Sequence, residues 1–156
     1  MHRPLIALIL ILSIKLIITN RETEPNTLTL QFTEQHRQYI KDSINQPNLT
    51  TAQIYLEPVP LAKDIMGITI PLATNKYLIL ISPNYPDQEH TVQHELVHVK
   101  QMHTRALVKQ ADTWYWQEEP IDWQEPYEWR PWEQLAELEA RLWEFEYQLR
   151  KAKHSK

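Results

Sequence analysis

At positions 93–101 the chain reads Gln93-His94-Glu95-Leu96-Val97-His98-Val99-Lys100-Gln101, and this stretch contains the pattern H-E-x-x-H. Residues four apart on a helix lie one above the other, so His94 and His98 are predicted to point the same way. Two such imidazoles can bind one zinc ion, and Glu95 then lies beside the open coordination position. A carboxylate there can take a proton from a zinc-bound water, because the metal lowers the pKa of that water. The motif therefore predicts zinc ligands at His94 and His98, with Glu95 as the general base.

The residues around the motif indicate that its helix is buried. Four of them are large and apolar: Val92, Leu96, Val97 and Val99. Histidine and glutamate side chains in a buried helix need polar partners or a metal ion. The alternative, a surface helix with two hydrated histidines, is disfavoured by this apolar pattern.

The composition limits the possible functions. With 156 residues there is room for one domain and a short appendage. A net charge of −4 without a basic patch gives no reason to expect nucleic acid as a partner. The chain has no cysteine, which excludes disulfides and cysteine-bound zinc. Gly67 is its only glycine, which excludes glycine-rich phosphate-binding loops.

The N-terminus begins with an apolar run at residues 5–18. The run is shorter than the roughly 20 residues of a membrane helix and is interrupted by Lys15. A signal peptide has this pattern, while an uncleaved anchor and a buried N-terminal strand or helix are alternatives. We therefore assign residues 1–24 to a signal peptide or membrane anchor with the start of a linker, and residues 25–156 to one domain. We expect an exported or membrane-anchored protein on the periplasmic or extracellular side, with a cytoplasmic location still open.

Alternating apolar residues and turn residues predict the order of elements in the domain. Strands are predicted at 27–32, 52–57, 67–72 and 76–82, and a helix at 33–45. Asp87 is a good N-cap for the motif helix, which is predicted from about Gln88 to about Val108. The last helix is predicted from Pro131, a favoured first helical residue, to about Lys151.

Two further histidines lie on the motif helix. His90 is four residues before His94, so it is either a group behind the metal ligands or an exposed residue of the first turn. His103 lies away from that face and receives no role.

Residues 111–130 form an acidic segment that is rich in aromatic residues and broken by prolines. It is long for a loop without structure, which favours a packed lid or binding loop over the metal site. The alternative is an insertion whose tryptophans simply pack on the two long helices. Tyr115 or Tyr127 is a candidate for stabilising an oxyanion.

A catalytic zinc site normally has three protein ligands, so one ligand is missing from the motif. A carboxylate of the last helix is the natural candidate, and Glu133, Glu137 and Glu139 compete for the role. Glu133 and Glu137 are each followed three residues later by an alanine, which permits close approach to the motif helix. Glu139 lies on the most apolar side, where an ion needs a strong partner. Spacing alone does not choose among the three.

Two stretches together resemble a known family: His94-Glu95-Leu96-Val97-His98-Val99-x-Gln101, and Arg130-Pro131-Trp132-Glu133-x-x-Ala136. They are similar to the small gluzincin-type zinc metallopeptidase domains of bacteria and phages, over roughly residues 76–147. In that family a second helix donates a glutamate, often in an E-x-x-A-D setting. The resemblance implies that His94 and His98 bind zinc and that Glu95 is the general base. It implies Glu133 as the third ligand, ahead of Glu137, because an acidic residue follows Ala136 whereas Arg141 follows Ala140.

We therefore predict an α+β, zincin-like domain with a small sheet, an HExxH helix and a C-terminal helix that donates a glutamate. It is expected to bind one zinc ion per chain and to hydrolyse a peptide or protein substrate, which could add to the edge of strand 76–82. The main alternative is a catalytically inactive zinc-binding protein that acts in structure or partner binding. A di-iron carboxylate protein also contains E-x-x-H, but it needs a second copy and four long helices, which this sequence lacks.

Overall fold

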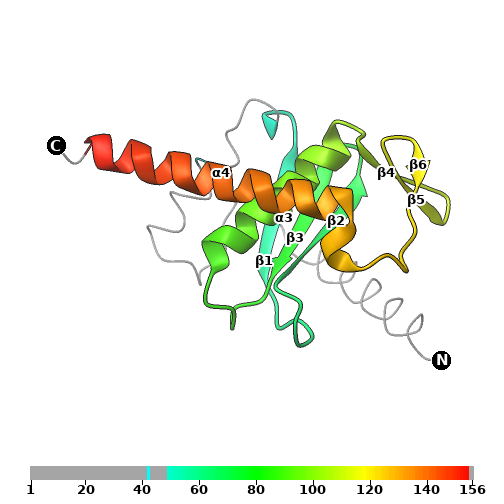
Figure 1. The fold of residues 1–156 in the computed structure, drawn as a ribbon, viewed down its shortest axis with the longest axis horizontal. Helices are drawn as coiled ribbons and strands as arrows, with labels where there is room; N and C mark the ends of the chain where they lie inside the picture. The colour runs from blue at the N-terminus through cyan, green and yellow to red at the C-terminus, as the bar shows by residue number, and fades with distance from the viewer. Residues whose placement is uncertain (1–41, 43–48, 155–156) are drawn as a thin grey trace.

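The computed structural model describes residue 42 and residues 49–154 (Figure 1). The predicted segment 1–24, the strand at 27–32 and, apart from Asp42, the helix at 33–45 lie outside these residues. Within the described part, no helix combines the length and the apolar character needed to cross a membrane. The described fold is α+β, with two small sheets and two long helices.

The first sheet contains β1 (Gln53–Pro58), β2 (Gly67–Ala73) and β3 (Lys76–Ile81), in the order β1-β3-β2. All three strands were predicted to within one residue at each end. β3 pairs parallel with β1 and antiparallel with β2, and five consecutive side chains of β3 are buried. Such an apolar run is typical of a central strand. The prediction that a substrate adds to the edge of β3 is therefore wrong, because both edges of β3 are already paired.

The motif helix α3 (Gln88–His103) lies between this sheet and the last helix, α4 (Pro131–His154) (Figure 1). As predicted, the Asp87 side chain caps α3 and accepts a hydrogen bond from the His90 backbone N–H at 3.1 Å. Packing on two sides explains why even polar residues of α3 are buried.

The prediction that α3 continues to Val108 is wrong. The helix ends at His103, and Arg105 adopts a left-handed conformation with φ 63°. Such a residue often ends a helix, and glycine usually occupies the position. Leu107 and Val108 then belong to the strand that follows.

α4 approaches α3 closely over its first half. Ala136 and Ala140 are fully buried there, as expected for small residues at a helix contact. Lys100 of α3 and Glu139 of α4 form an ion pair of 2.6 Å, which supplies the strong partner that Glu139 was expected to need. Glu139 is thereby committed to a role away from the two motif histidines.

The second sheet contains β4 (Leu107–Gln110), β5 (Thr113–Trp116) and β6 (Glu119–Pro120), paired in that order and antiparallel. A short 3-10 helix, η2 (Tyr127–Trp129), follows and leads directly into α4. Segment 111–130 is thus partly regular structure and lies beside the N-terminal end of α4 (Figure 1).

Candidate metal centre

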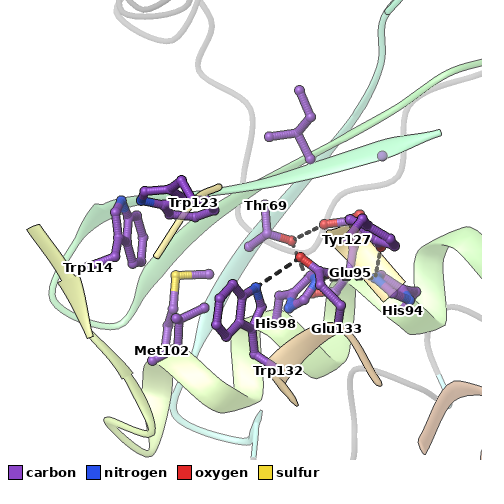
Figure 2. Close-up of a pocket in the computed structure, with 13 residues that line it drawn as sticks. Thr69, His94, Glu95, His98, Met102, Trp114, Trp123, Tyr127, Trp132 and Glu133 are labelled. Atoms are coloured by element: carbon purple, nitrogen blue, oxygen red, sulfur yellow. Dashed lines mark hydrogen bonds and ion pairs between the residues drawn. The ribbon is translucent and has the colours of Figure 1, made fainter. Parts of the chain in front are cut away.

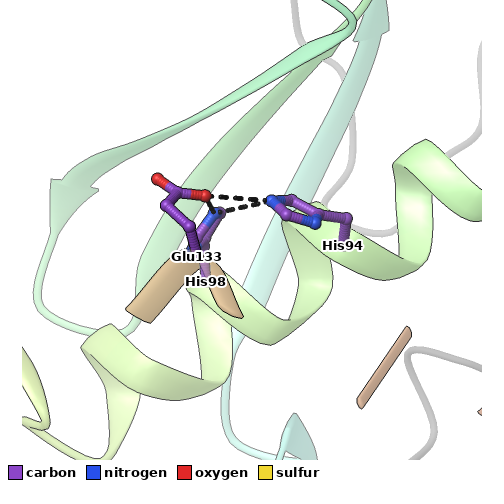
Figure 3. A group of neighbouring side chains, drawn as sticks. All are labelled: His94, His98 and Glu133. Carbon is purple, nitrogen blue, oxygen red and sulfur yellow. Dashed lines mark hydrogen bonds and ion pairs between the residues drawn. The ribbon is translucent and has the colours of Figure 1, made fainter. Parts of the chain in front are cut away.

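Three side chains from two helices converge on one point (Figure 3). Nε2 of His94 and Nε2 of His98 lie 3.1 Å apart. Oε2 of Glu133, from α4, lies 3.2 Å from the first and 3.1 Å from the second. Among the described residues these three are the group of histidine and carboxylate side chains that can hold a metal ion.

The spacing of these three atoms fits a tetrahedral ion. An ion about 2.0–2.1 Å from each donor, with tetrahedral angles, requires the donors to be about 3.3 Å apart. The observed separations of 3.1–3.2 Å are close to this value. Two imidazoles and one carboxylate also form a ligand set that zinc commonly takes, with a fourth position left open.

A hydrogen-bond chain orients His98 for metal binding. The Gln101 side-chain amide donates to the Trp132 carbonyl at 2.8 Å, so its oxygen faces His98. His98 Nδ1 lies 2.9 Å from that oxygen and must carry the proton there. When the imidazole is neutral, the lone pair of Nε2 is therefore directed at the candidate metal position, which is how ligand histidines are usually held.

The Glu133 carboxylate is held by both of its oxygens. Oε1 accepts a hydrogen bond from the Trp132 indole N–H at 3.0 Å, which leaves Oε2 for the two histidines. Burial raises the pKa of Glu133, but hydrogen bonds from His94 and His98 lower it more, so its pKa lies well below the usual range. Glu133 is consequently ionised, as a metal ligand must be.

The pKa of His98 is also shifted by its neighbours. Burial lowers its pKa, while the hydrogen bond to Glu133 and the nearby charge of Glu95 raise it, and the net pKa lies above the ordinary value of 6.5. A site that stabilises positive charge at this position also favours a cation in place of the proton.

Glu137, the second candidate for the third ligand, lies behind His94 and outside this group. Its Oε2 is 3.7 Å from His94 Nδ1, which is long for a hydrogen bond, and 3.0 Å from His90 Nε2. Arg141 donates to its other oxygen at 2.6 Å. Of the two roles considered for His90, the contact with Glu137 fits the one behind the metal ligands.

Glu95 points into the same region from the part of α3 that faces β2. Its side chain is buried, with the residue only 5 % exposed, and Thr69 of β2 donates a hydrogen bond to its Oε2 at 2.6 Å. Burial raises the pKa of Glu95, partly offset by the charge on His98. Gly67 lies so close that a Cβ there would be 2.7 Å from Glu95 Oε1. The only glycine of the chain therefore gives the Glu95 carboxylate its space.

These groups line a hollow of about 260 Å³, called here the metal cleft (Figure 2). Its polar end carries Thr69, His94, Glu95, His98, Tyr127 and Glu133. Its other end is apolar and carries Met102, Trp114 and Trp123 (Figure 2); Ile68, Leu107 and Trp132 also line the cleft. The cleft therefore combines a candidate metal position with an adjoining apolar surface.

The two tyrosines proposed for the oxyanion are placed differently. The Tyr127 hydroxyl lies 3.3 Å from His94 Nε2 and lines the metal cleft, whereas Tyr115 does not. Neighbouring residues of a strand point to opposite faces, so Trp114 faces the cleft and Tyr115 faces away from it. Burial, with the charge of Glu133, raises the pKa of Tyr127, which keeps its hydroxyl protonated.

Residues of segment 111–130 line the metal cleft, and its tryptophans also pack on α4, whereas its role as a lid or binding loop stays a prediction. Trp123 lies edge-on to Trp132 of α4, with ring centroids 5.9 Å apart. Arg130 donates to the carbonyls of Glu125 and Trp123 and lies over the Trp123 ring. These contacts hold the segment in place over the apolar end of the cleft.

Several residues of the site received no role from sequence. Gln101 lies three residues after His98 on the same helix face, and that spacing is a signal that was available. Gly67 could have been singled out from the sequence because it is the only glycine of the chain. Thr69 and Trp132 had none, because their contacts depend on how β2 and α4 pack against α3.

Comparisons of this chain with protein-family models, with curated proteins and with solved structures find no match.

Proposed function

We propose that the protein is a zinc-dependent metallopeptidase of gluzincin type with a zincin-like fold. The observation that carries the proposal is the convergence of three donor atoms within 3.2 Å of one another, with the Glu95 carboxylate lining the same cleft. His94, His98 and Glu133 would hold one zinc ion per chain. The ion, when bound, supplies a Lewis acid that polarises the scissile carbonyl and lowers the pKa of the attacking water.

Glu95 is the proton carrier in this proposal. It takes a proton from the attacking water and later delivers it to the leaving amine. Its raised pKa, caused first by burial, brings it nearer to the pH at which a carboxyl group both accepts and returns a proton. The Thr69 hydroxyl keeps the carboxylate oriented during both transfers.

The remaining groups of the metal cleft have roles toward the substrate. The protonated Tyr127 hydroxyl is placed to donate to an oxyanion that develops beside the ligand group. The partner is a peptide or protein, which would lie along β2, because no described strand pairs with the outer edge of β2. The apolar end of the cleft would accept a large apolar side chain. The apolar run at residues 5–18 supports a protein that is exported or anchored to a membrane.

Hydrolysis is tested with the zinc-loaded full chain and a mixed peptide library read by mass spectrometry. Glu95→Gln keeps the size of the side chain but removes the base, so it should bind one zinc per chain and lose about 10²–10⁴-fold in turnover. Full turnover by a zinc-loaded Glu95→Gln variant contradicts the mechanism. A zinc-loaded parent that cleaves no peptide supports the inactive zinc-binding alternative instead.

A further inference from the structure

A second hollow lies beside the metal cleft, across a shared wall. It has a volume of about 340 Å³, and Met102, Leu107 and Trp114 line both spaces. The two hollows are therefore neighbours on one surface, one on each side of these three side chains.

The second hollow is basic, and we call it the basic pocket. Among the described residues, its lining includes His103, Arg105 and Lys109 and no aspartate or glutamate. This is notable in a chain whose net charge is −4. Within the part of the chain that the structure describes, no carboxylate forms an ion pair with Arg105 or Lys109.

The polar groups of the basic pocket are also held in place. His103 Nε2 lies 2.9 Å from the Thr51 hydroxyl, and its Nδ1 lies 3.4 Å from the Tyr77 hydroxyl. The Arg105 backbone N–H donates to the Met102 carbonyl at 3.2 Å, which fixes the turn that carries the guanidinium. Arg105 and Lys109, which have no ion-pair partner among the described residues, thus line this pocket together with a His103 ring that is held by two hydroxyl groups.

β2 connects the two hollows. Gly67, Ile68 and Thr69 line the metal cleft, while Pro71 and Ala73, further along the strand, line the basic pocket. A strand rises about 3.3 Å per residue, so Thr69 and Ala73 are about 13 Å apart. An extended peptide on this edge, with its scissile bond at the metal cleft, reaches the basic pocket about four residues away.

We infer that the basic pocket binds a carboxylate of the substrate, about four residues from the scissile bond. Arg105 offers a planar pair of donors that matches a carboxylate, and Lys109 adds a second positive charge. The carboxylate belongs either to an acidic side chain or to the C-terminus of the peptide. This inference rests on the proposed function, because it assumes that a peptide occupies the metal cleft.

Binding without turnover tests the inference directly. The probe is a mixture of ten-residue, otherwise uncharged peptides in which one Glu, or its isostere Gln, occupies each position in turn. Each peptide is made with a free and with an amidated C-terminus. The zinc-loaded full chain carrying Glu95→Gln captures peptides from the mixture, and mass spectrometry measures their enrichment.

The inference predicts that Glu peptides are enriched over Gln peptides by about tenfold at one position, the order expected for a charged hydrogen bond. Enrichment of free over amidated C-termini, whatever the position of Glu, instead identifies the terminal carboxylate as the ligand. In a variant that combines Arg105→Gln and Lys109→Gln, either enrichment ratio should fall to about one. It should persist with Lys153→Gln, an exposed lysine near the end of α4 that serves as the matched control.

Equal capture of acidic and neutral peptides by the parent, or a preference that the double substitution leaves intact, overturns the inference. So does the absence of any captured peptide. Its failure is separable from that of hydrolysis. If the protein prefers Glu peptides but cleaves none, carboxylate binding by the basic pocket is supported and hydrolysis is contradicted. If it cleaves Glu and Gln peptides at equal rates, hydrolysis is supported and carboxylate binding by the basic pocket is contradicted.

Discussion

The two walls of the metal cleft serve different groups. On the α4 wall, the Trp132 indole holds Oε1 of Glu133, while Oε2 faces the two histidines. Gln101 links the Trp132 carbonyl to His98. On the β2 wall, Gly67 leaves space for the Glu95 carboxylate and Thr69 donates a hydrogen bond to it. The motif helix lies between the walls and presents its histidines to one and its glutamate to the other. Metal binding and proton transfer therefore depend on different parts of the molecule and should fail separately.

The largest effect is expected from the α4 wall. Glu133→Ala removes one of three ligands, so zinc affinity should fall by more than about 100-fold, beyond the usual cost of losing an outer partner. Calorimetric titration of the metal-free protein measures this. Glu139→Ala is the matched control, because Glu139 lies on the same helix but pairs with Lys100. Equal losses in both variants would mean that α4 matters for stability and not as a source of a ligand.

A smaller loss of zinc is expected at Gln101. Gln101→Leu leaves the Nδ1 proton of His98 without its acceptor, and such changes usually cost about 10–100-fold in metal affinity. Gln101→Glu keeps an acceptor oxygen toward His98 and should lose less. If Leu and Glu at this position bind zinc equally well, Gln101 does not orient the histidine.

The β2 wall is tested at Gly67. A Cβ there would lie 2.7 Å from Glu95 Oε1 and 2.9 Å from Thr91 Cγ2, so Gly67→Ala should lower the free energy of unfolding by about 1–3 kcal/mol. Turnover should fall while zinc content is retained, because the displaced group is the base. Part of the stability loss should disappear in a Glu95→Ala background, where the first contact is gone. A Gly67→Ala variant that loses zinc but keeps its turnover per bound zinc contradicts the separation of the walls.

The pH dependence of zinc binding should depend on both walls, because Glu133 on one and Glu95 beside the other both raise the pKa of His98. Zinc needs a neutral His98, and the pKa of His98 in the metal-free protein is raised above 6.5, so protons compete with zinc up to a higher pH. Affinity should rise with pH through that pKa and fall by about tenfold per pH unit below it. Glu95→Gln removes one charge that raises this pKa and should shift the midpoint to lower pH. A midpoint below 6.5 in the parent contradicts the assignment.

The parts of this site that follow from short-range geometry were predictable from the sequence. The convergence of His94 and His98, four residues apart, is a property of any helix, and so is the cap at Asp87. The end of α3 was missed because a left-handed residue usually marks such an end as glycine, and this chain has Arg105 there.

The parts that depend on packing were harder to predict. Glu133 lies 35 and 39 positions from the two histidines, and spacing alone did not separate it from Glu137 and Glu139. The Thr69 contact with Glu95 spans 26 positions and has no local signal. The central place of β3 was different, since its apolar run from Tyr77 to Ile81 was readable and was wrongly taken to lie at an edge.

The central claim is that His94, His98 and Glu133 bind one zinc ion, and zinc uptake by the full chain tests it most directly. Titration of the metal-free protein, followed by X-ray absorption of the loaded protein, should show one zinc per chain. The ligands should be two nitrogens at about 2.0–2.1 Å and carboxylate oxygen at about 2.0–2.2 Å. A folded protein that takes up no zinc contradicts the account. So does one whose zinc ligands are unchanged after His94→Ala, His98→Ala or Glu133→Ala.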